Sequence, residues 1–136
     1  MAVSAMQTCL RLPPEPQSVR QAREHVRNTL EGAGREEWVD DAALAVSELV
    51  SNVVLHAGTD CELSVSVSWD SARVSVRDFS TALPVERHYG ADATTGRGLT
   101  IVAQLSADFG VDPLGPDGKV VWFVVDDSST DATGSA

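Results

Sequence analysis

Residues 61–76 contain the pattern that most constrains the fold of this chain. Apolar side chains occupy every second position from Cys61 to Trp69, with a polar residue between each pair. A turn follows at Asp70, and the alternation resumes as far as Val76. A period of two that pauses at a turn predicts a β-hairpin with one buried and one polar face. The fold should therefore contain an antiparallel sheet.

Two segments before this hairpin have helical periodicity. Apolar residues spaced by three or four predict a helix over about 17–32. Ser18 and Gln21 match a capping box at its start, and glycines predict its end. A second helix is predicted over about 36–57, because acidic residues open it and Gly58 follows it.

The other elements complete an order that defines the fold class. They are a strand at 6–12, a long loop at 80–96, a helix with Leu99, Val102 and Leu105 inward, a short strand at 107–111, a turn at 112–118 and a strand at 119–126. This order predicts an α+β two-layer sandwich, in which a mostly antiparallel sheet is covered by helices on one face. The last strand is the most apolar and should lie centrally.

Composition narrows the class of protein. The 136 residues suit one domain, expected over 1–126, followed by a small polar tail at 127–136 that we expect to be disordered. A formal net charge of -10 argues against binding to nucleic acid or to an anionic membrane. Short apolar runs and the lack of a secretory signal predict a cytoplasmic protein. Cys9 and Cys61 form no CxxC pair, so we expect two small buried side chains rather than a disulfide or zinc site.

The stretch ELVSNVVLHA places three polar residues, Glu48, Asn52 and His56, at four-residue intervals within the second helix. Helical geometry puts them on one side, and unpartnered burial would be unfavourable, so that side should face a cleft. The amide oxygen of Asn52 suits Mg²⁺, and Glu48 could orient or deprotonate a nucleophile. A solvent-facing polar stripe explains the same spacing, and His56 could simply cap the helix end.

Two later segments add polar groups of related chemistry. In VRDFS, Asp78 ends a strand, where its carboxylate could accept a hydrogen bond from the exocyclic amine of adenine or could merely terminate the strand. In TGRGL, Gly96 and Gly98 let the backbone approach a ligand at the start of a helix, where free amides attract phosphate. Arg97 adds a cation, although a Gly-x-Gly by itself is usually a turn.

Taken in order, ELVSNVVLHA, VRDFS and TGRGL resemble the ATP-binding domain of the GHKL superfamily, which includes histidine kinases and type II topoisomerases. The compact layout is similar to the bacterial anti-sigma-factor serine/threonine kinases. The resemblance spans roughly residues 8–126. It implies a Bergerat-type fold with ATP between the long helix and a mobile lid at about 80–96.

The resemblance also implies roles for individual residues. Glu48 matches the catalytic base, Asn52 the Mg²⁺ ligand and Asp78 the carboxylate that reads adenine. Further nucleotide contacts are implied at His56, Gly96, Arg97, Gly98 and Leu99.

Two departures from the family pattern touch the base end of this site. The family's Asp-x-Gly-x-Gly is replaced by Asp78, Phe79 and Ser80, and Gly118 precedes Lys119 where a Thr is common. These changes put nucleotide affinity in question more than the fold.

Two classes of function follow. The first is an ATP- and Mg²⁺-dependent protein kinase that phosphorylates a Ser or Thr of a small anti-anti-sigma-type partner and separately binds a sigma factor. The alternative is a nucleotide-sensing or nucleotide-free protein-binding module without useful catalysis. A homodimer is compatible with both, and a purely structural α+β domain would require three coincidental motifs.

Overall fold

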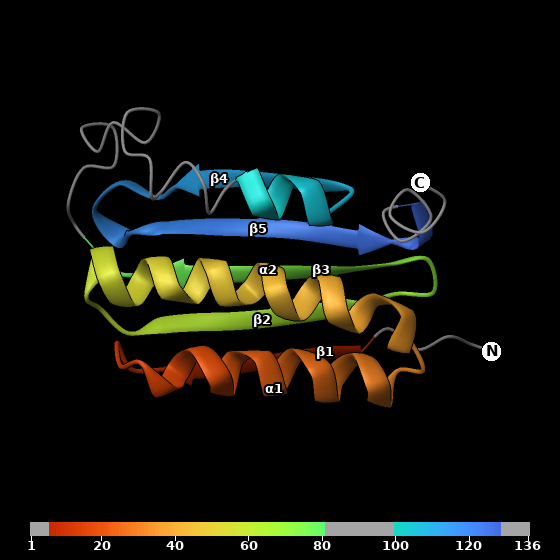
Figure 1. Cartoon of the computed structure of the whole chain (residues 1–136). Helices are drawn as coiled ribbons and strands as arrows, with labels where there is room; N and C mark the ends of the chain where they lie inside the picture. Colours follow the sequence, from red (N-terminus) through yellow and green to blue (C-terminus); the bar gives the residue numbers. More distant parts are fainter. Residues whose placement is uncertain (1–5, 81–99, 129–136) are drawn as a thin grey trace.

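The computed structural model of the chain describes residues 6–80 and 100–128. Within these residues, one antiparallel sheet has the strand order β1-β2-β3-β5-β4 (Figure 1). The strands are β1 Met6–Leu12, β2 Cys61–Val67, β3 Ser71–Asp78, β4 Asp108–Pro113 and β5 Lys119–Asp126. The predicted hairpin is confirmed as β2 and β3, which pair in register from Cys61 with Asp78 to Val67 with Ala72.

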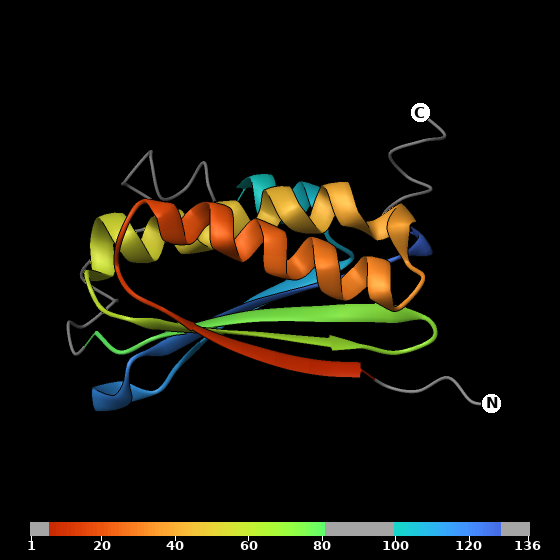
Figure 2. The same cartoon turned by 90° about the horizontal axis from the view of Figure 1, so that it is seen from below.

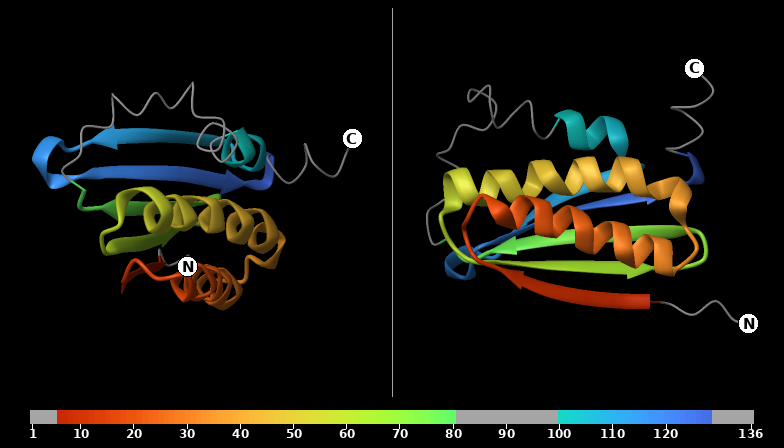
Figure 3. Two further views of the ribbon diagram at one scale, coloured as in Figure 1. Left: turned by 60° about the vertical axis from the view of Figure 1, so that its left-hand side comes forward. Right: turned by 60° about the horizontal axis from the view of Figure 1, so that its bottom comes forward.

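Helices cover one face of this sheet, so the predicted α+β sandwich is confirmed (Figure 2). The helix α1 spans Gln17–Gly32, as predicted. The predicted second helix is three consecutive pieces: the 3₁₀ turn η1 Glu36–Trp38, the α-helix α2 Val39–Asn52 and the π-turn η2 Val53–Ala57. Helical residues 100–105 lie beside α2 on the side opposite α1 (Figures 1 and 3).

The core lies between the two layers. It is built from the inward-facing residues of the strands and the apolar faces of α1 and α2. The largest of its fully buried side chains are Trp38, Phe123, Leu30 and Leu63. Trp38 anchors the start of the second helical stretch, because its Nε1 donates to Asp127 Oδ1 at 3.0 Å and Arg35 stacks on its ring. This packing fixes the position of α2 over the sheet.

The face of the sheet away from the helices carries polar and aromatic residues. Arg73 stacks on the Trp122 ring at 4.4 Å, and Trp122 packs so closely on Gly110 that a Cβ there would come within 2.6 Å of the indole. Cys9 lies on β1, and its side chain is exposed, so the expectation that both cysteines are buried is wrong for Cys9 and right for Cys61. The reason is strand alternation, which turns Cys9 away from the helices.

One local expectation, at the start of α1, differs from the structure, and one about the last strand is confirmed. The capping box is not formed: α1 begins at Gln17, and Ser18 inside its first turn donates its hydroxyl to the Pro13 carbonyl at 2.6 Å. The last strand, β5, lies inside the sheet as predicted, because it pairs on both sides, with β3 and with β4. Phe123 and Val125 of β5 are buried in the core.

The predicted lid, the tail beyond residue 128 and four predicted site residues lie outside the described residues. Those four are Gly96, Arg97, Gly98 and Leu99. The single-domain assignment over 1–126 stays a prediction.

Candidate functional site

The α-helical part of the second helical stretch presents Glu48 and Asn52 together. Both lie within α2, whose buried face is formed by residues such as Ala42, Val46 and Leu49. At about 100° per residue, positions four apart stay close around the axis, so the two side chains share a flank. Both are half-buried rather than enclosed by the core. This places a carboxylate and an amide at an accessible edge of the helix layer.

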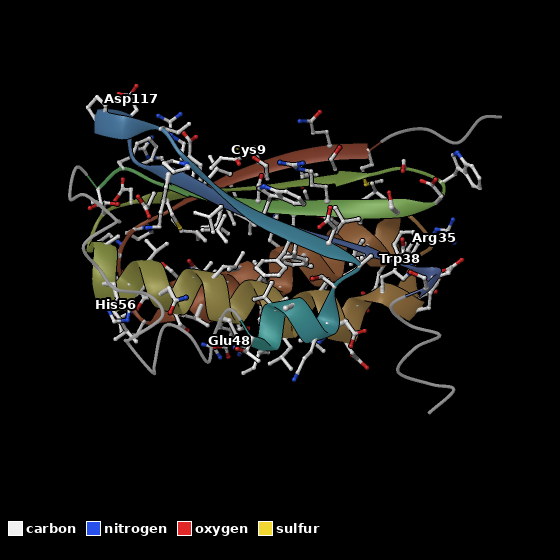
Figure 4. All side chains as sticks on the ribbon, turned by 90° about the horizontal axis from the view of Figure 1, so that it is seen from above. Cys9, Arg35, Trp38, Glu48, His56 and Asp117 are labelled. Carbon is white, nitrogen blue, oxygen red and sulfur yellow. The ribbon has the colours of Figure 1, made fainter. Side chains whose placement is uncertain are left out.

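The flank that carries Glu48 faces away from α1. Ser47 lies on the α1 side, where Arg23 donates to its hydroxyl at 3.4 Å. Glu48 is one residue further, about 100° around the helix axis, and therefore points away from α1. Figure 4 shows the labelled Glu48 and His56 on the side of the helix layer that is turned away from the sheet. Among the described residues, no side-chain hydrogen bond or ion pair engages Glu48 or Asn52.

His56 lies in a different backbone geometry from the other two members of the predicted stripe. The helix widens after Asn52 into the π-turn, and the Gly58 amide donates to the Val53 carbonyl at 2.8 Å. Gly58 then ends the helix in the left-handed region at φ 68°. His56 is exposed, so its place in the stripe is not fixed by α-helical spacing. Such π-turns often occur at functional sites.

Asp78, at the end of β3, has an environment opposite to that of Glu48. It is 2% exposed, and both of its carboxylate oxygens are hydrogen-bonded. Ser80 donates its backbone N–H to Oδ1 at 3.1 Å, and the Lys119 ammonium donates to Oδ2 at 2.6 Å. The sequence predicted an acceptor for adenine here. The structure shows an acceptor that already has two donors.

The chain topology brings the end of α2 and the end of β3 to the same end of the molecule. The helix leads through Thr59 and Asp60 into β2, and β3 returns antiparallel to finish opposite Cys61. A direct contact joins the two ends, because the Phe79 backbone N–H donates to Thr59 Oγ1 at 3.1 Å. The end of the second helical stretch and the end of β3, which carries Asp78, are therefore joined at one end of the fold.

Asp78 is buried, and its neighbours Cys61 and Gly118 lie close to it. Burial, with a smaller effect from the charges of Asp78 and Asp60, raises the pKa of the Cys61 thiol to about 11. Gly118 has φ 98°, and a Cβ there would collide with the backbone carbonyl oxygen of Asp78. The glycine before Lys119 is therefore required for the close approach of the two strand ends.

Lys119 is the site residue whose contribution was not predicted. In the sequence, Lys119 stands out only because it follows Gly118 at a position where the family commonly has a Thr. Its partner follows from strand register, since Lys119 lies directly opposite Asp78 in the pairing of β3 with β5. That register is a property of the folded sheet, so no local signal near residue 119 could have shown it.

The donor set of α2 fits a divalent cation that keeps most of its ligands from water or phosphate. Asn52 offers one amide oxygen, and Glu48 lies one turn earlier. Mg²⁺ is commonly held by one or two protein oxygens together with substrate phosphates. Among the described residues there is no group of three or more His, Cys, Asp or Glu side chains able to hold a metal ion by themselves.

The fold defines a class of protein, an α+β domain in which helices cover one face of an antiparallel sheet. A family model for the histidine kinase-like ATPase domain matches residues 12–125. The chain therefore belongs to the histidine kinase-like ATPase domain family, and the family resemblance seen in the sequence is confirmed.

One solved structure shows the same fold. The crystal structure of the RsbU and RsbW domains of Rv1364c from Mycobacterium tuberculosis superposes with a TM-score of 0.69 at 19% sequence identity. The match covers 89% of this chain and 32% of that chain, so this chain corresponds to about a third of the length of that solved chain. At this identity, the similarity shows the fold alone. No curated protein matches the chain.

None of the helices in the described parts of the chain is both long and apolar enough to cross a membrane.

Proposed function

We propose that this protein is an ATP-dependent serine/threonine protein kinase of the regulatory type that resembles anti-sigma factors. The observation that carries the proposal is the pair Glu48 and Asn52, which share an accessible flank of α2 in a member of an ATPase domain family. Both side chains are half-buried and have no hydrogen-bond or ion-pair partner among the described residues, as expected for groups that bind a ligand. Residues whose role is purely structural would be expected to pair with neighbours or to pack.

In this proposal, Asn52 holds the Mg²⁺ that neutralises the charge of the ATP phosphates. Glu48 accepts the proton of a partner's Ser or Thr hydroxyl. The hydroxyl oxygen then forms a bond to the γ-phosphorus, while the bond from that phosphorus to the bridging oxygen breaks and its electrons leave with ADP. Most of the rate enhancement would come from positioning and charge neutralisation, with the base adding about 100-fold or more.

The proposed substrate is a small protein of the anti-anti-sigma type, and a sigma factor is the proposed second partner. The fold similarity to a structure that contains an RsbW domain supports this choice. Cytoplasmic location and a homodimer are part of the same proposal. The nucleotide contacts implied for His56, Gly96, Arg97, Gly98 and Leu99 also remain proposals.

A second function is favoured by one specific observation. Asp78 is buried and paired with Lys119, so the base end of the site is less open than its α2 end. A protein with this arrangement could sense nucleotide weakly, or bind partners without nucleotide, and carry out no phosphoryl transfer.

Transfer of ³²P from labelled ATP to a co-purified partner tests the proposal. Wild-type protein should label the partner, whereas Glu48→Gln should label it about 100-fold more slowly. Asp40→Asn is a matched control, because it removes another α2 carboxylate from an exposed position in the first turn. Equal labelling by wild type and Glu48→Gln would exclude Glu48 as the base. Nucleotide binding without any transfer would establish the second function.

A further inference from the structure

The pairing of Lys119 with Asp78 changes what the base end of the proposed site can do. The two residues lie opposite each other on β5 and β3. Lys119 Nζ lies 2.6 Å from Asp78 Oδ2, and the side chains are 22% and 2% exposed. Lys119 is the only lysine in the sequence. In the described structure, the ammonium group of the chain's single lysine is therefore paired with the carboxylate that is proposed to bind the base.

Asp78 accepts hydrogen bonds on both oxygens before any ligand arrives. The Ser80 backbone N–H reaches Oδ1, and Lys119 reaches Oδ2. A purine amine that binds this carboxylate must approach one of these two oxygens. The Ser80 donor is part of the backbone at the end of β3, whereas a lysine ammonium sits on a flexible four-carbon stem. Lys119 is therefore the donor that a base can displace.

We propose that Lys119 is a built-in competitor of the nucleotide base, and that it holds the base end of the site closed until nucleotide displaces it. This inference rests on the proposed function, since it takes Asp78 to be the base-binding carboxylate. In the closed state the ammonium occupies the position of the exocyclic amine. In the open state the amine takes Oδ2, and the Lys119 head moves outward along a side chain that is already partly exposed.

The strengths of the competing contacts give the direction of the effect. An ammonium group is attracted to a carboxylate by its full positive charge as well as through the hydrogen bond, whereas a neutral amine offers the hydrogen bond alone. Exchanging the ammonium for a neutral amine therefore weakens the hydrogen bond at Oδ2 and leaves a buried carboxylate without its counter-ion. In a variant that lacks the Lys119 ammonium, Asp78 Oδ2 has no donor, and the exocyclic amine of the base can donate to it without displacing another group. Removing the charge of Lys119 should therefore tighten nucleotide binding.

Isothermal titration with the non-hydrolysable ATP analogue AMPPNP and Mg²⁺ tests this inference on three forms of the chain. Lys119→Met keeps an unbranched side chain that is one atom shorter and removes its charge, and we expect a Kd about tenfold lower than that of wild type. Arg73→Met is the matched control for loss of one positive charge, because Arg73 lies on the opposite face of the sheet and stacks on Trp122. Its Kd should equal that of wild type or be slightly higher.

The possible results separate the inference from the function on which it rests. Equal, measurable Kd values for wild type and Lys119→Met would overturn the competition and leave the proposed function standing. No binding by wild type or by folded Lys119→Met would overturn both. If Lys119→Met does not fold, Lys119→Ala takes its place, since a smaller apolar side chain also removes the competing charge.

A second measurement uses the wild-type chain and needs no variant. Brief acetylation with an amine-reactive ester, followed by mass spectrometry of the peptide containing Lys119, reports the exposure of this one lysine. Displacement predicts that saturating AMPPNP raises the acetylation rate of Lys119 several-fold relative to the N-terminal amine. An unchanged or lower rate, in protein shown to be saturated, would mean that Lys119 stays on Asp78 or moves onto the nucleotide, and would overturn the inference.

Discussion

The two ends of the candidate site differ in how their polar groups are satisfied. On α2, Glu48 and Asn52 are half-buried and make no side-chain hydrogen bond or ion pair with described residues. At the end of β3, Asp78 is buried and its two oxygens are occupied by Ser80 and Lys119. An open pair of groups can receive a ligand without losing an existing contact. A buried, paired carboxylate exchanges one partner for another, so its ligand affinity depends on what it releases.

This difference also predicts how mutations divide between function and stability. Groups without internal partners can be removed with little effect on folding, because folding gained nothing from them. A buried ion pair that loses one member leaves a charge without compensation, and folding is weakened. Mutations of Glu48 or Asn52 on α2 should therefore change activity alone, whereas mutations of Asp78 or Lys119 should change both the stability of the fold and nucleotide binding. The following four experiments test that division, beginning with the largest expected effect.

Glu48→Gln should lower phosphoryl transfer by about 100-fold or more and change the free energy of unfolding by less than about 0.5 kcal/mol. Single-turnover transfer and urea denaturation measure the two quantities. A large loss of stability would show that Glu48 has a structural partner, and the contrast between the two ends would then fail.

Gly118→Ala should destabilise the protein by about 3 kcal/mol, since the new Cβ would collide with the Asp78 carbonyl in a backbone that already has φ 98°. Gly58→Ala is the matched control at the end of the helix. It also has positive φ, but nothing lies within 4 Å of its added Cβ, so we expect about 1 kcal/mol. Equal effects in urea denaturation would show that the end of β3 is as loosely packed as the end of the helix.

Asp78→Asn should lower the free energy of unfolding by about 2 kcal/mol, because Lys119 loses its partner although it keeps some contact with water. Asn52→Ala should leave stability unchanged or raise it by up to about 0.5 kcal/mol, since Ala is the better helix former. Thermal and urea unfolding of both variants and of wild type measure these changes in the free energy of unfolding. Similar losses in the two variants would contradict the proposed division.

The smallest expected effect is a loss of stability at alkaline pH. Burial raises the pKa of Cys61 to about 11 from an ordinary value of 9.0, so the folded state favours the protonated thiol. Stability is full below about pH 9 and falls as the pH rises toward 11, by about 1 kcal/mol at pH 10. Comparing unfolding at pH 8 and pH 10 for wild type and Cys61→Ala measures this contribution, which the variant should lack.

The strand and helix elements could largely be predicted from sequence because their signals are local. In β2, apolar and polar residues alternate from Cys61 to Val67, and in α1 the apolar residues recur every three or four positions. Each pattern reflects which face of a single element is buried, so it can be recognised within one segment. The exposure of Cys9 was missed for a related reason, since a loose alternation does not say which set of β1 residues faces the helices. The π-turn after Asn52 was also missed, because its residues read as ordinary helix.

The candidate site was predicted in part. The spacing of Glu48 and Asn52 placed them correctly on one flank, since four residues make nearly one turn of an α-helix. The state of Asp78 could not be predicted, because its partner is 41 residues away in the sequence. The roles of these residues in catalysis and binding remain proposals, which the experiments above test.

By itself, the sequence determined the kinds of element, the two-layer class and the chemical character of α2, because each of these follows from residue spacing along one segment. The tertiary structure alone decided that Lys119 faces Asp78, because that contact depends on the register between β3 and β5. Register is set by how whole strands pair and pack, and a shift of one residue would turn Lys119 to the opposite face of the sheet.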